Sequence, residues 1–274
     1  LAFLSRDGGS SDGVKMVIAI RNTTDLWRSN LPVPSPEGHK YHRGHTAILG
    51  ANEFTGATRL AAEACSRIGS GLVSVLSETQ AQVYRTALPP DIMVSERGLS
   101  ALNRVNTILA GPGGCADDQA KMLLDSDPSV SLVVDADAIR LWPQLSGRDV
   151  IMTPHEGEFV RYFGHLDGDL LEQVGTASEQ SGAVIVLKRP QTIIAAPDGR
   201  IIVNHSASRY LAKGGTGDVL AGMIAGFVAQ GMKEIPAACA AVWMHSVASE
   251  RIGPGLLPQD IIPLVRPLLH ELLS

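Results

Sequence analysis

Short apolar runs alternate with helical stretches along most of this chain, and no other feature constrains its fold as strongly. Each run is bounded by Gly, Pro or Asp, and most are followed by residues with helical spacing. Short apolar strands of this kind are typical of a parallel sheet that is covered on both faces. The runs are 46–49, 72–76, 107–110, 132–134, 150–152 and 184–187. The pattern therefore predicts an α/β fold, with three α/β/α layers around a mostly parallel central sheet.

The second half of the chain adds a hairpin and several helices. Residues 193–196 and 200–203 flank a Pro-Asp-Gly turn, which predicts an antiparallel hairpin. An Ala-rich amphipathic stretch predicts an early helix, and three apolar stretches predict helices near the end of the chain. The four expected helices cover 56–68, 219–230, 236–248 and 260–273.

The leading segment differs in composition from the rest of the chain. Residues 5–13 are rich in Gly, Ser and Asp, as flexible linkers are. The chain begins with Leu1 rather than Met, which predicts that it is the C-terminal part of a longer protein. We therefore expect 1–26 to be a linker or the tail of a preceding domain, and 27–274 to form one domain.

The composition argues against several classes of function. With a net charge of −5 and 4% aromatic residues, the chain lacks the basic excess and the stacking side chains of nucleic-acid-binding proteins. No apolar stretch is long enough to span a membrane, and no signal-peptide pattern opens the chain, so no membrane partner is expected. The three cysteines form no Cys-x-x-Cys pair, which argues against disulfides or a zinc site and favours the cytoplasm.

The run Gly214-Gly215-Thr216-Gly217-Asp218 is the strongest candidate for a functional site. A glycine turn that opens a helix presents unpaired N–H groups and the positive end of the helix dipole, which together bind anions. A carboxylate within such a turn indicates a phosphate-binding site with Asp218 as a catalytic base. The alternative is an Asp that the dipole favours near a helix start, whatever the function.

Ligands of open parallel sheets bind beyond the carboxyl ends of the strands, so the residues after each predicted strand are site candidates. Gly111-Pro112-Gly113-Gly114 follows one strand and fits the start of a Gly-x-Gly-x-x-Ala dinucleotide pattern. Because Pro112 removes a backbone donor and earlier strands precede the loop, an NAD(P)-dependent dehydrogenase is disfavoured. No Gly-x₄-Gly-Lys-Ser/Thr pattern occurs, which excludes a P-loop NTPase.

Charged side chains follow two other strands. Asp135 and Asp137 are expected to point to the same side, where they could position a ligand or a cation-bound water. In the alternative, Asp137 caps a helix that begins at Ala138. Lys188 ends an apolar strand, and we expect its ammonium group to reach a phosphate in the cleft rather than to extend into solvent.

Two segments carry residue types that bind metals. Glu158 lies in the first turn of a predicted helix, where it either favours the dipole or orders Mg²⁺ and water near phosphates. His155 has no second ligand at a metal-binding spacing, so we expect it to bind or orient the ligand. His39, His42 and His45 have a lysine and an arginine among them, and these charges disfavour a cation. We interpret that segment as a polar entry to the first strand.

Taken together, these motifs resemble the ribokinase-like superfamily, and within it the ADP/ATP-dependent NAD(P)H-hydrate dehydratases. The resemblance covers residues 27–272 in consistent order. The superfamily likeness rests on 215–218, and the dehydratase likeness on 39–45 and 153–159, which sugar kinases generally lack. The matching segments are His39-Lys-Tyr-His-Arg-Gly-His45, Phe54-Thr-Gly-Ala57, Gly111-Pro-Gly113, Val134-Asp-Ala-Asp-Ala138, Thr153-Pro-His-Glu-Gly-Glu-Phe159, Lys188 to Thr192 and Leu211-Ala-Lys-Gly-Gly-Thr-Gly-Asp-Val-Leu220.

The resemblance implies a three-layer ribokinase-like fold and a repair reaction that uses ADP or ATP and Mg²⁺. In that family, NAD(P)H that carries water at C6 of the nicotinamide ring, NAD(P)HX, is returned to NAD(P)H. Asp218 matches the family's catalytic residue, which takes the proton from the C6 hydroxyl as the hydroxyl attacks the terminal phosphoryl group; phosphate is then eliminated. Gly113 and His155 match positions that hold the hydrate together with Asp218. Asp135 is expected beside them, and Glu158 matches the acid that orders magnesium.

The same resemblance implies a nucleotide-binding segment. The expected nucleotide-binding residues are Lys188, Arg189, Pro190, Gln191, Thr192, Gly214, Gly215, Thr216 and Gly217. Two positions near the nucleotide-binding residues depart from the family pattern. Arg189 stands where the family usually has Gly, and Arg209-Tyr210 stand where smaller residues are common. Two alternative functions therefore stay open. One is a small-molecule kinase that acts on a sugar, vitamin precursor or pyridoxal, and the other is a non-catalytic adenine-nucleotide-binding module. The leading segment resembles the junction of bifunctional members, which implies fusion to an epimerase domain, and we also expect a homo-oligomer.

Overall fold

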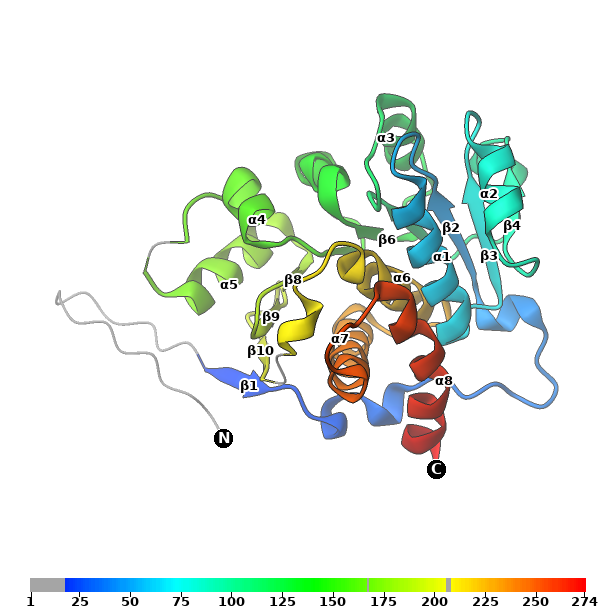
Figure 1. Ribbon diagram of the computed structural model, residues 1–274. Helices are drawn as coiled ribbons and strands as arrows, with labels where there is room; N and C mark the ends of the chain where they lie inside the picture. Colours follow the sequence, from blue (N-terminus) through cyan, green and yellow to red (C-terminus); the bar gives the residue numbers. More distant parts are fainter. Residues whose placement is uncertain (1–17, 167, 206–207) are drawn as a thin grey trace, which may run out of the picture.

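The computed structural model describes residues 18–166, 168–205 and 208–274, and within this part ten strands form one sheet (Figure 1). Their order across the sheet is β1-β10-β9-β8-β7-β6-β5-β2-β3-β4. Neighbouring strands are parallel except in the pairs β8–β9 and β9–β10. The mostly parallel sheet and the antiparallel hairpin are thus confirmed.

Every apolar run of the sequence becomes a strand within one residue of its expected bounds. The strands are β1 (Ala19–Arg21), β2 (His45–Leu49), β3 (Leu72–Leu76), β4 (Met93–Ser95), β5 (Thr107–Ala110), β6 (Ser131–Val134), β7 (Val150–Met152), β8 (Val184–Leu187), β9 (Thr192–Ala195) and β10 (Ile201–Asn204). The sequence pattern did not single out β4, a three-residue edge strand whose side chains are only partly covered.

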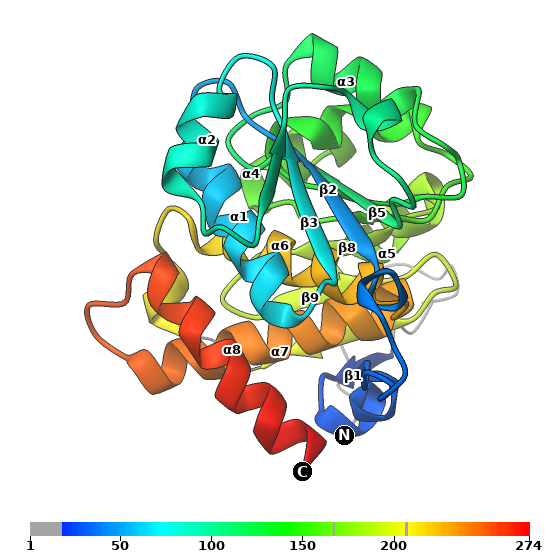
Figure 2. The same ribbon diagram turned by 90° about the vertical axis from the view of Figure 1, so that its right-hand side faces the viewer.

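Helices cover both faces of the sheet (Figures 1 and 2). Alternate strand residues such as Ile48 and Leu109 join a large apolar core with α1, α6, α7 and α8. Their neighbours Ala47 and Ile108 face the opposite layer, which contains α3 and the 3₁₀ segment η5; α4 and α5 lie next to these. The helical segments are α1 (Thr55–Ile68), α2 (Ala81–Ala87), α3 (Asp117–Leu124), η5 (Ala136–Gln144), α4 (Glu156–Phe163), α5 (Leu170–Ser181), α6 (Thr216–Ala229), α7 (Glu234–Ile252) and α8 (Pro258–Leu273). The four predicted helices are confirmed, and the three-layer architecture follows.

Helices α1 and α6 pack backbone against backbone. A Cβ atom at Gly222 would lie 2.1 Å from the carbonyl oxygen of Ala61, and one at Gly226 would lie 2.8 Å from that of Cys65. Only glycine permits this approach, since a real Cβ atom essentially never comes so close. The two contacts are four residues apart on both helices, so the helices run in the same direction and both begin at the carboxyl edge of the sheet.

Part of the segment expected to be a linker or tail packs on the domain. Strand β1 pairs with β10, and the Asn22 side chain donates to Asn204 at 3.0 Å and to the Cys239 carbonyl at 2.9 Å. Trp27 is fully buried and donates to Asn22 at 3.1 Å. The division expected at residue 26 therefore does not coincide with a break in the packing, and the linker expected at 5–13 lies outside the described residues.

The entry to β2 carries the three clustered histidines. The rings of His39 and His42 stack with their centroids 3.7 Å apart beside the 3₁₀ segment η3 (Lys40–Arg43). His45 is buried in β2, where its ring bonds Ser74 at 2.8 Å and the Asn103 carbonyl at 3.0 Å. His39 and His42 therefore contact each other before the strand, whereas His45 forms separate hydrogen bonds within the sheet.

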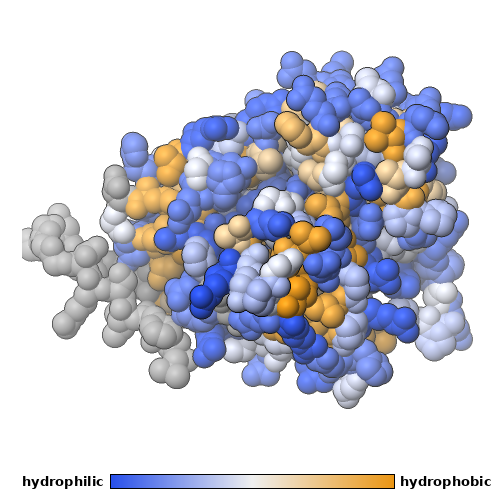
Figure 3. Space-filling view, viewed as in Figure 1, coloured by the Kyte–Doolittle hydropathy of each residue, from blue (hydrophilic) through white to orange (hydrophobic). Residues whose placement is uncertain are grey.

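The surface carries mixed polar and apolar groups. On the face seen in Figure 3, hydrophilic residues cover most of the area and hydrophobic residues form separate patches. None of the helices in the described ranges is long and apolar enough to cross a membrane.

Candidate active site

A glycine turn opens α6 at the carboxyl edge of the sheet. Gly215 is the N-cap residue and has a φ of 97°, in the left-handed region that favours glycine. The Thr216 hydroxyl donates to the carbonyls of Leu211 at 2.8 Å and Lys213 at 2.9 Å, which holds the turn closed. Gly215 has no side chain that could cap α6, and the Thr216 N–H donates to the Lys213 carbonyl at 3.3 Å. The N–H groups of Gly217 and Asp218 are the ones placed to meet an anionic ligand.

Asp218 lies in this first turn and is partly buried. Burial raises the pKa of its carboxyl group to about 7, and the negative charge of Asp135 acts in the same direction. The positive charge of Lys188 opposes both effects without cancelling them. Asp218 therefore titrates in the neutral range, as a general acid or base should.

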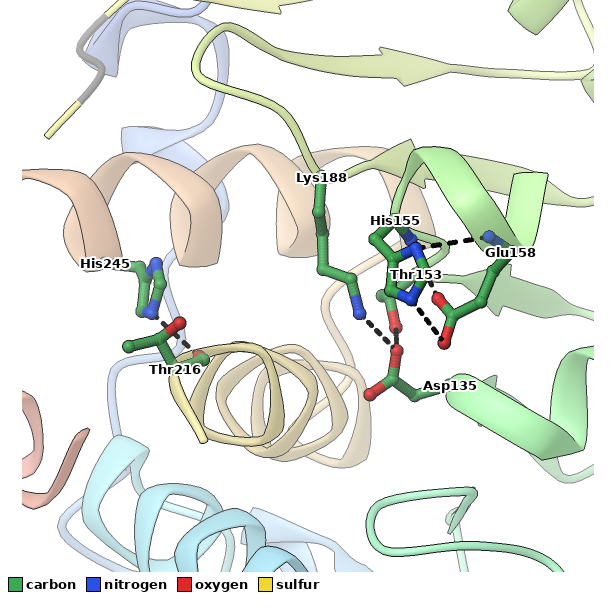
Figure 4. A network of polar contacts seen from close by, with 7 residues as sticks. All are labelled: Asp135, Thr153, His155, Glu158, Lys188, Thr216 and His245. Atoms are coloured by element: carbon green, nitrogen blue, oxygen red, sulfur yellow. Dashed lines mark hydrogen bonds and ion pairs between the residues drawn. The ribbon is translucent and has the colours of Figure 1, made fainter. Parts of the chain in front are cut away.

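Lys188 follows β8, and its side chain extends toward Asp135 (Figure 4). Its Nζ lies 2.6 Å from Oδ1 of Asp135, which also accepts a 2.7 Å hydrogen bond from Thr153. A Cβ atom at Gly217 would lie 3.3 Å from the same Nζ. Burial lowers the pKa of Lys188, but Asp135 and Glu158 outweigh it and raise the pKa, so the ammonium group stays charged beside the glycine turn.

A second helix, α4, begins at the same edge with a different end structure. His155 is its N-cap residue, and its Nδ1 accepts a hydrogen bond from the Glu158 N–H at 3.2 Å. The Glu158 carboxylate in turn accepts from the His155 N–H at 2.8 Å (Figure 4). This reciprocal pair is a capping box. The expected place of Glu158 in the first turn is confirmed, and its carboxylate already has a structural partner.

His245 is a site residue that the sequence analysis missed. It lies on α7, is 5% exposed, and its Nε2 lies 2.9 Å from the Thr216 carbonyl (Figure 4). Burial lowers its pKa to about 4, so at neutral pH the ring is uncharged and Nε2 carries the proton that it donates to Thr216. His245 thereby steadies the glycine turn from behind. Nothing in the apolar sequence of α7 distinguishes this histidine from an ordinary core residue.

These elements surround a cavity of about 700 Å³. Most of the expected site residues line it, whereas Gly113, Gln191 and Glu158 do not. The expected residues that line it are Asp135, His155, Lys188, Arg189, Pro190, Thr192, Gly214, Gly215, Thr216, Gly217 and Asp218. Lining residues that were not expected to be in the site are Ser208, Leu211, Ala212, Lys213, Leu220, Val242, His245 and Ser246. Of these, Leu211, Ala212 and Lys213 had a sequence signal, because they directly precede the glycine run in the segment that matches the family.

Arg189 and Arg209, the two departures on this side, both line the cavity. Arg189 pairs with Glu156 of α4, with 2.5 Å between Nε and Oε1. The backbone N–H of Lys188 donates to the Pro154 carbonyl at 2.8 Å. The turn after β8 and the start of α4 are therefore joined by one backbone bond and one ion pair.

The structure corrects the expectations for the aspartates after β6. The helical segment there is η5, which begins at Ala136 with Asp135 at its N-cap position, so Asp137 does not cap a helix at Ala138. Asp135 is 3% exposed, whereas Asp137 is exposed to solvent. They do not share a side, because the chain leaves the extended conformation at Ala136, whose φ is +46°.

Gly113 belongs to a loop that lies beside the start of α1. A Cβ atom at Gly113 would lie 2.4 Å from the Phe54 carbonyl oxygen and 3.2 Å from the Cβ of Ala57. The Thr58 hydroxyl donates to the Pro112 carbonyl at 3.0 Å, which ties the loop to α1. The loop therefore stands on the α1 side of Asp218, opposite the turn that follows β8.

The site offers oxygen ligands but no ready-made metal cage. Within the described ranges, no three His, Cys, Asp or Glu side chains are grouped so that they could hold a metal ion. The acidic side chains near the glycine turn offer carboxylate oxygens. Mg²⁺ binds to one or two such groups and keeps waters and substrate phosphates as its other ligands.

Comparisons with known proteins agree with this geometry. A family model described as NAD(P)H-hydrate dehydratase matches residues 46–261. The chain is 34% identical over 271 residues to the bifunctional NAD(P)H-hydrate repair enzyme Nnr of Methanopyrus kandleri, with 91% of this chain and 53% of that protein covered. It is 31% identical over 259 residues to the protein of the same name from Coxiella burnetii, with 88% and 53% covered. The chain spans about half the length of the curated relatives it matches.

Solved structures give the same picture. A ribokinase-like superfamily protein from Enterococcus faecalis superposes with a TM-score of 0.81 and 27% identity, covering 91% of this chain and 95% of that one. The ADP/ATP-dependent NAD(P)H-hydrate dehydratase of Bacillus subtilis, co-crystallised with ATP and Mg²⁺, superposes with a TM-score of 0.79 and 26% identity, covering 93% and 99%. The ribokinase-like fold expected from the sequence is confirmed.

Proposed function

Because this chain belongs to the NAD(P)H-hydrate dehydratase family, we propose that it converts hydrated NAD(P)H back to NAD(P)H at the expense of ADP or ATP. The single observation that carries this proposal is the placement of Asp218. A carboxyl group with a pKa of about 7 stands in the first turn of an uncapped helix, beside the ammonium group of Lys188. The turn suits a phosphoryl group, and the carboxylate suits the removal of a proton from a hydroxyl group.

The proposed reaction begins with proton transfer to Asp218. The C6 hydroxyl of the hydrate loses its proton to the Asp218 carboxylate as its oxygen attacks the terminal phosphorus of the nucleotide. The bond to the leaving nucleotide breaks, which releases AMP from ADP or ADP from ATP. The first-turn N–H groups of α6 and the Lys188 ammonium stabilise the charge on the transferring group. Phosphate then leaves C6, a proton leaves the neighbouring ring carbon, and the ring double bond is restored.

We propose that Mg²⁺ arrives with the nucleotide rather than occupying a resident site. When bound, it neutralises phosphate charge and orients the terminal phosphoryl group. Besides Asp218, Asp135 and Glu158 supply carboxylates near the glycine turn, but both already accept hydrogen bonds within the protein. They fit contact with a hydrated ion better than direct capture of a bare one.

The proposal is tested by incubating the purified chain with hydrated NADH, Mg²⁺ and either ADP or ATP. We expect the absorbance of NADH to return together with free phosphate. A stable phosphorylated product with no NADH would instead indicate a kinase of the same fold. Nucleotide binding without any phosphate release would indicate a non-catalytic binding module. Either of these outcomes, in a chain shown to be folded, would reject the repair function.

The relatives are bifunctional proteins about twice as long as this chain. We infer that this domain acts beside an NAD(P)HX epimerase domain, in the cytoplasm, where reduced nicotinamide cofactors are used and damaged. We also infer a homo-oligomer, which light scattering on the purified chain would test. A monomer at micromolar concentration would reject that inference and leave the repair reaction untouched.

A further inference from the structure

Phe54 is an aromatic side chain left outside the core at the edge that holds the site. It stands at the N-cap position of α1, beyond the carboxyl end of β2, and is 70% exposed. In the described ranges, no other aromatic side chain is among the large apolar side chains that are exposed. Trp27, Tyr84 and Phe159, by contrast, are fully buried. Folding therefore does not account for an aromatic ring at this position.

The backbone around Phe54 is held firmly. The N–H of Ala51 donates to the Thr58 hydroxyl at 3.0 Å, and the Tyr84 hydroxyl donates to the Ala51 carbonyl at 2.7 Å. Asn52 accepts a 2.8 Å hydrogen bond from the Thr79 hydroxyl. The exposed ring is thus presented from a fixed frame, as a side chain that orients a ligand should be.

The packing of α1 on α6 shows what Phe54 lies next to. Ala61 meets Gly222 and Cys65 meets Gly226, with the same four-residue step on both helices. One step earlier, the same register sets Ala57 at the level of Asp218. A Cβ atom at Gly113 would touch Ala57 at 3.2 Å. The Gly113 loop therefore packs closely on the start of α1, and the two form one wall on the α1 side of Asp218.

Phe54 precedes Ala57 by three residues, which is close to one helical turn. It therefore lies on the same side of α1 as Ala57, about one turn nearer the amino end of the helix. Its own carbonyl oxygen borders Gly113, where a Cβ would come within 2.4 Å. The cavity of about 700 Å³ is lined by Asp218 and by the turn after β8, and its lining includes neither Phe54 nor Gly113. Phe54 and Gly113 therefore lie on the α1 side of Asp218, which leaves that side for the molecule whose hydroxyl Asp218 deprotonates.

We propose that the Phe54 ring packs against the reduced nicotinamide ring of the hydrate and sets its position before Asp218. This proposal rests on the repair function proposed above. An aromatic face packs well on the apolar CH₂ groups of this partly saturated ring, and it supplies no polar group that would compete for the C6 hydroxyl. Phe54 acts as a positioning residue, because it binds the ring and takes no part in proton or phosphoryl transfer.

The test is Phe54→Ala, with Phe54→Tyr as the conservative variant. We expect the alanine variant to raise KM for hydrated NADH about tenfold, with KM for the nucleotide unchanged, and the tyrosine variant to retain a KM near that of wild type. Val33→Ala is the matched control, since Val33 is 72% exposed and lies in the leading segment. An equal KM in wild type and Phe54→Ala, or an equal change in the Val33 control, would overturn the proposal.

Hydrated reduced nicotinamide mononucleotide identifies which end of the substrate the ring contacts. If Phe54 packs on the nicotinamide ring, Phe54→Ala raises KM for this half-substrate by the same factor as for hydrated NADH. A change confined to the full dinucleotide would place the contact at the adenosine end and overturn the proposal.

A separate binding measurement keeps the two proposals distinguishable. NADH, the expected product, is titrated into wild type and Phe54→Ala by its own fluorescence, with no turnover required. We expect Kd to rise about tenfold in the variant. If wild type fails to repair hydrated NADH, the repair function is rejected, whereas an equal NADH Kd in both proteins rejects the role of Phe54.

Discussion

Helices α4 and α6 begin at the same edge of the sheet, and each carries an acid in the third position of its first turn. In α4, Glu158 is used by the helix itself, because its carboxylate bonds the His155 N–H and completes a capping box. In α6, the N-cap is Gly215, which has no side chain to cap the helix, and Asp218 is left available. The same local sequence signature therefore supports the fold at one helix and carries the chemistry at the other, and the N-cap residue makes the difference.

Asp218→Asn gives the strongest test of this contrast. The amide keeps the shape of the side chain but cannot accept the proton, so we expect kcat/KM to fall by at least about 10³-fold. Nucleotide binding should change little, because the glycine turn is intact. Steady-state rates and calorimetric titration with ADP measure the two quantities.

The matching change in α4, Glu158→Gln, serves as the control for Asp218→Asn. Glutamine can still accept from the His155 N–H, so the capping box survives. If Glu158→Gln reduced the rate as much as Asp218→Asn, the two first-turn acids would share the chemistry and the contrast would be wrong.

Gly215→Ala tests the uncapped turn. With φ at 97°, alanine is strained, and its Cβ would meet side-chain atoms of Pro258 and Leu60 at 2.8 and 2.9 Å. We expect a loss of about 1–3 kcal/mol in the free energy of unfolding and weaker binding of ADP. Chemical denaturation measures the free energy of unfolding, and titration measures the affinity for ADP.

Gly147→Ala is the matched control for Gly215→Ala. Gly147 has a φ of +82° and open space around its Cβ position, and it is outside the site. It should lose stability through the same backbone strain and keep its affinity for ADP. Equal loss of ADP affinity in both variants would show that the effect on binding is global.

The pH dependence of the rate follows from the pKa of Asp218. Because burial raises that pKa to about 7, the carboxyl group is protonated below this pH and cannot act as a base. We expect kcat/KM to fall about tenfold for each pH unit below 7 and to be constant above it. A rate that stays flat down to pH 5, where only an unperturbed carboxylate remains ionised, would contradict the assignment.

Glu158→Ala should have the smallest effect of these changes. Loss of the capping carboxylate is expected to lower the free energy of unfolding by about 1 kcal/mol, while Glu158→Gln leaves it nearly unchanged. Thermal unfolding of the two variants measures the difference. A rate loss in Glu158→Gln at low Mg²⁺ that excess Mg²⁺ restores would add a metal-ordering role to the structural one.

Much of the fold could be predicted because most of the strands carry their own local signal. A buried parallel strand must be apolar on both faces, so the run at 184–187 reads as a strand in isolation. Strand β4 carries no such signal, since its residues lie at the sheet edge and are only partly buried. Strand β1 lies in the segment 1–26 that was expected to be a linker or the tail of a preceding domain, because its pairing with β10 joins residues about 180 positions apart.

The site residues, like the strands, could be predicted where the signal was local in the sequence and could not where it depended on tertiary contacts. Gly215 and Asp218 were recognisable because a glycine turn and its acid lie within four residues of each other. Asp137 was misjudged because strand alternation was extended past Ala136, whose positive φ ends it. His245 was missed because its role depends on a contact between α7 and the first turn of α6, 29 residues away along the chain.

The sequence by itself determined the strands, the glycine turn and the family resemblance, since these depend on residues that are neighbours in the chain. Only the tertiary structure decided which groups work together. It buried Asp218 near Asp135 and Lys188, which moves the pKa of Asp218 to about 7. It closed Glu158 into a cap and left Phe54 exposed beside Gly113. A pKa or a ligand contact depends on distances between residues far apart in sequence, and those distances exist only once the sheet and its helices have packed.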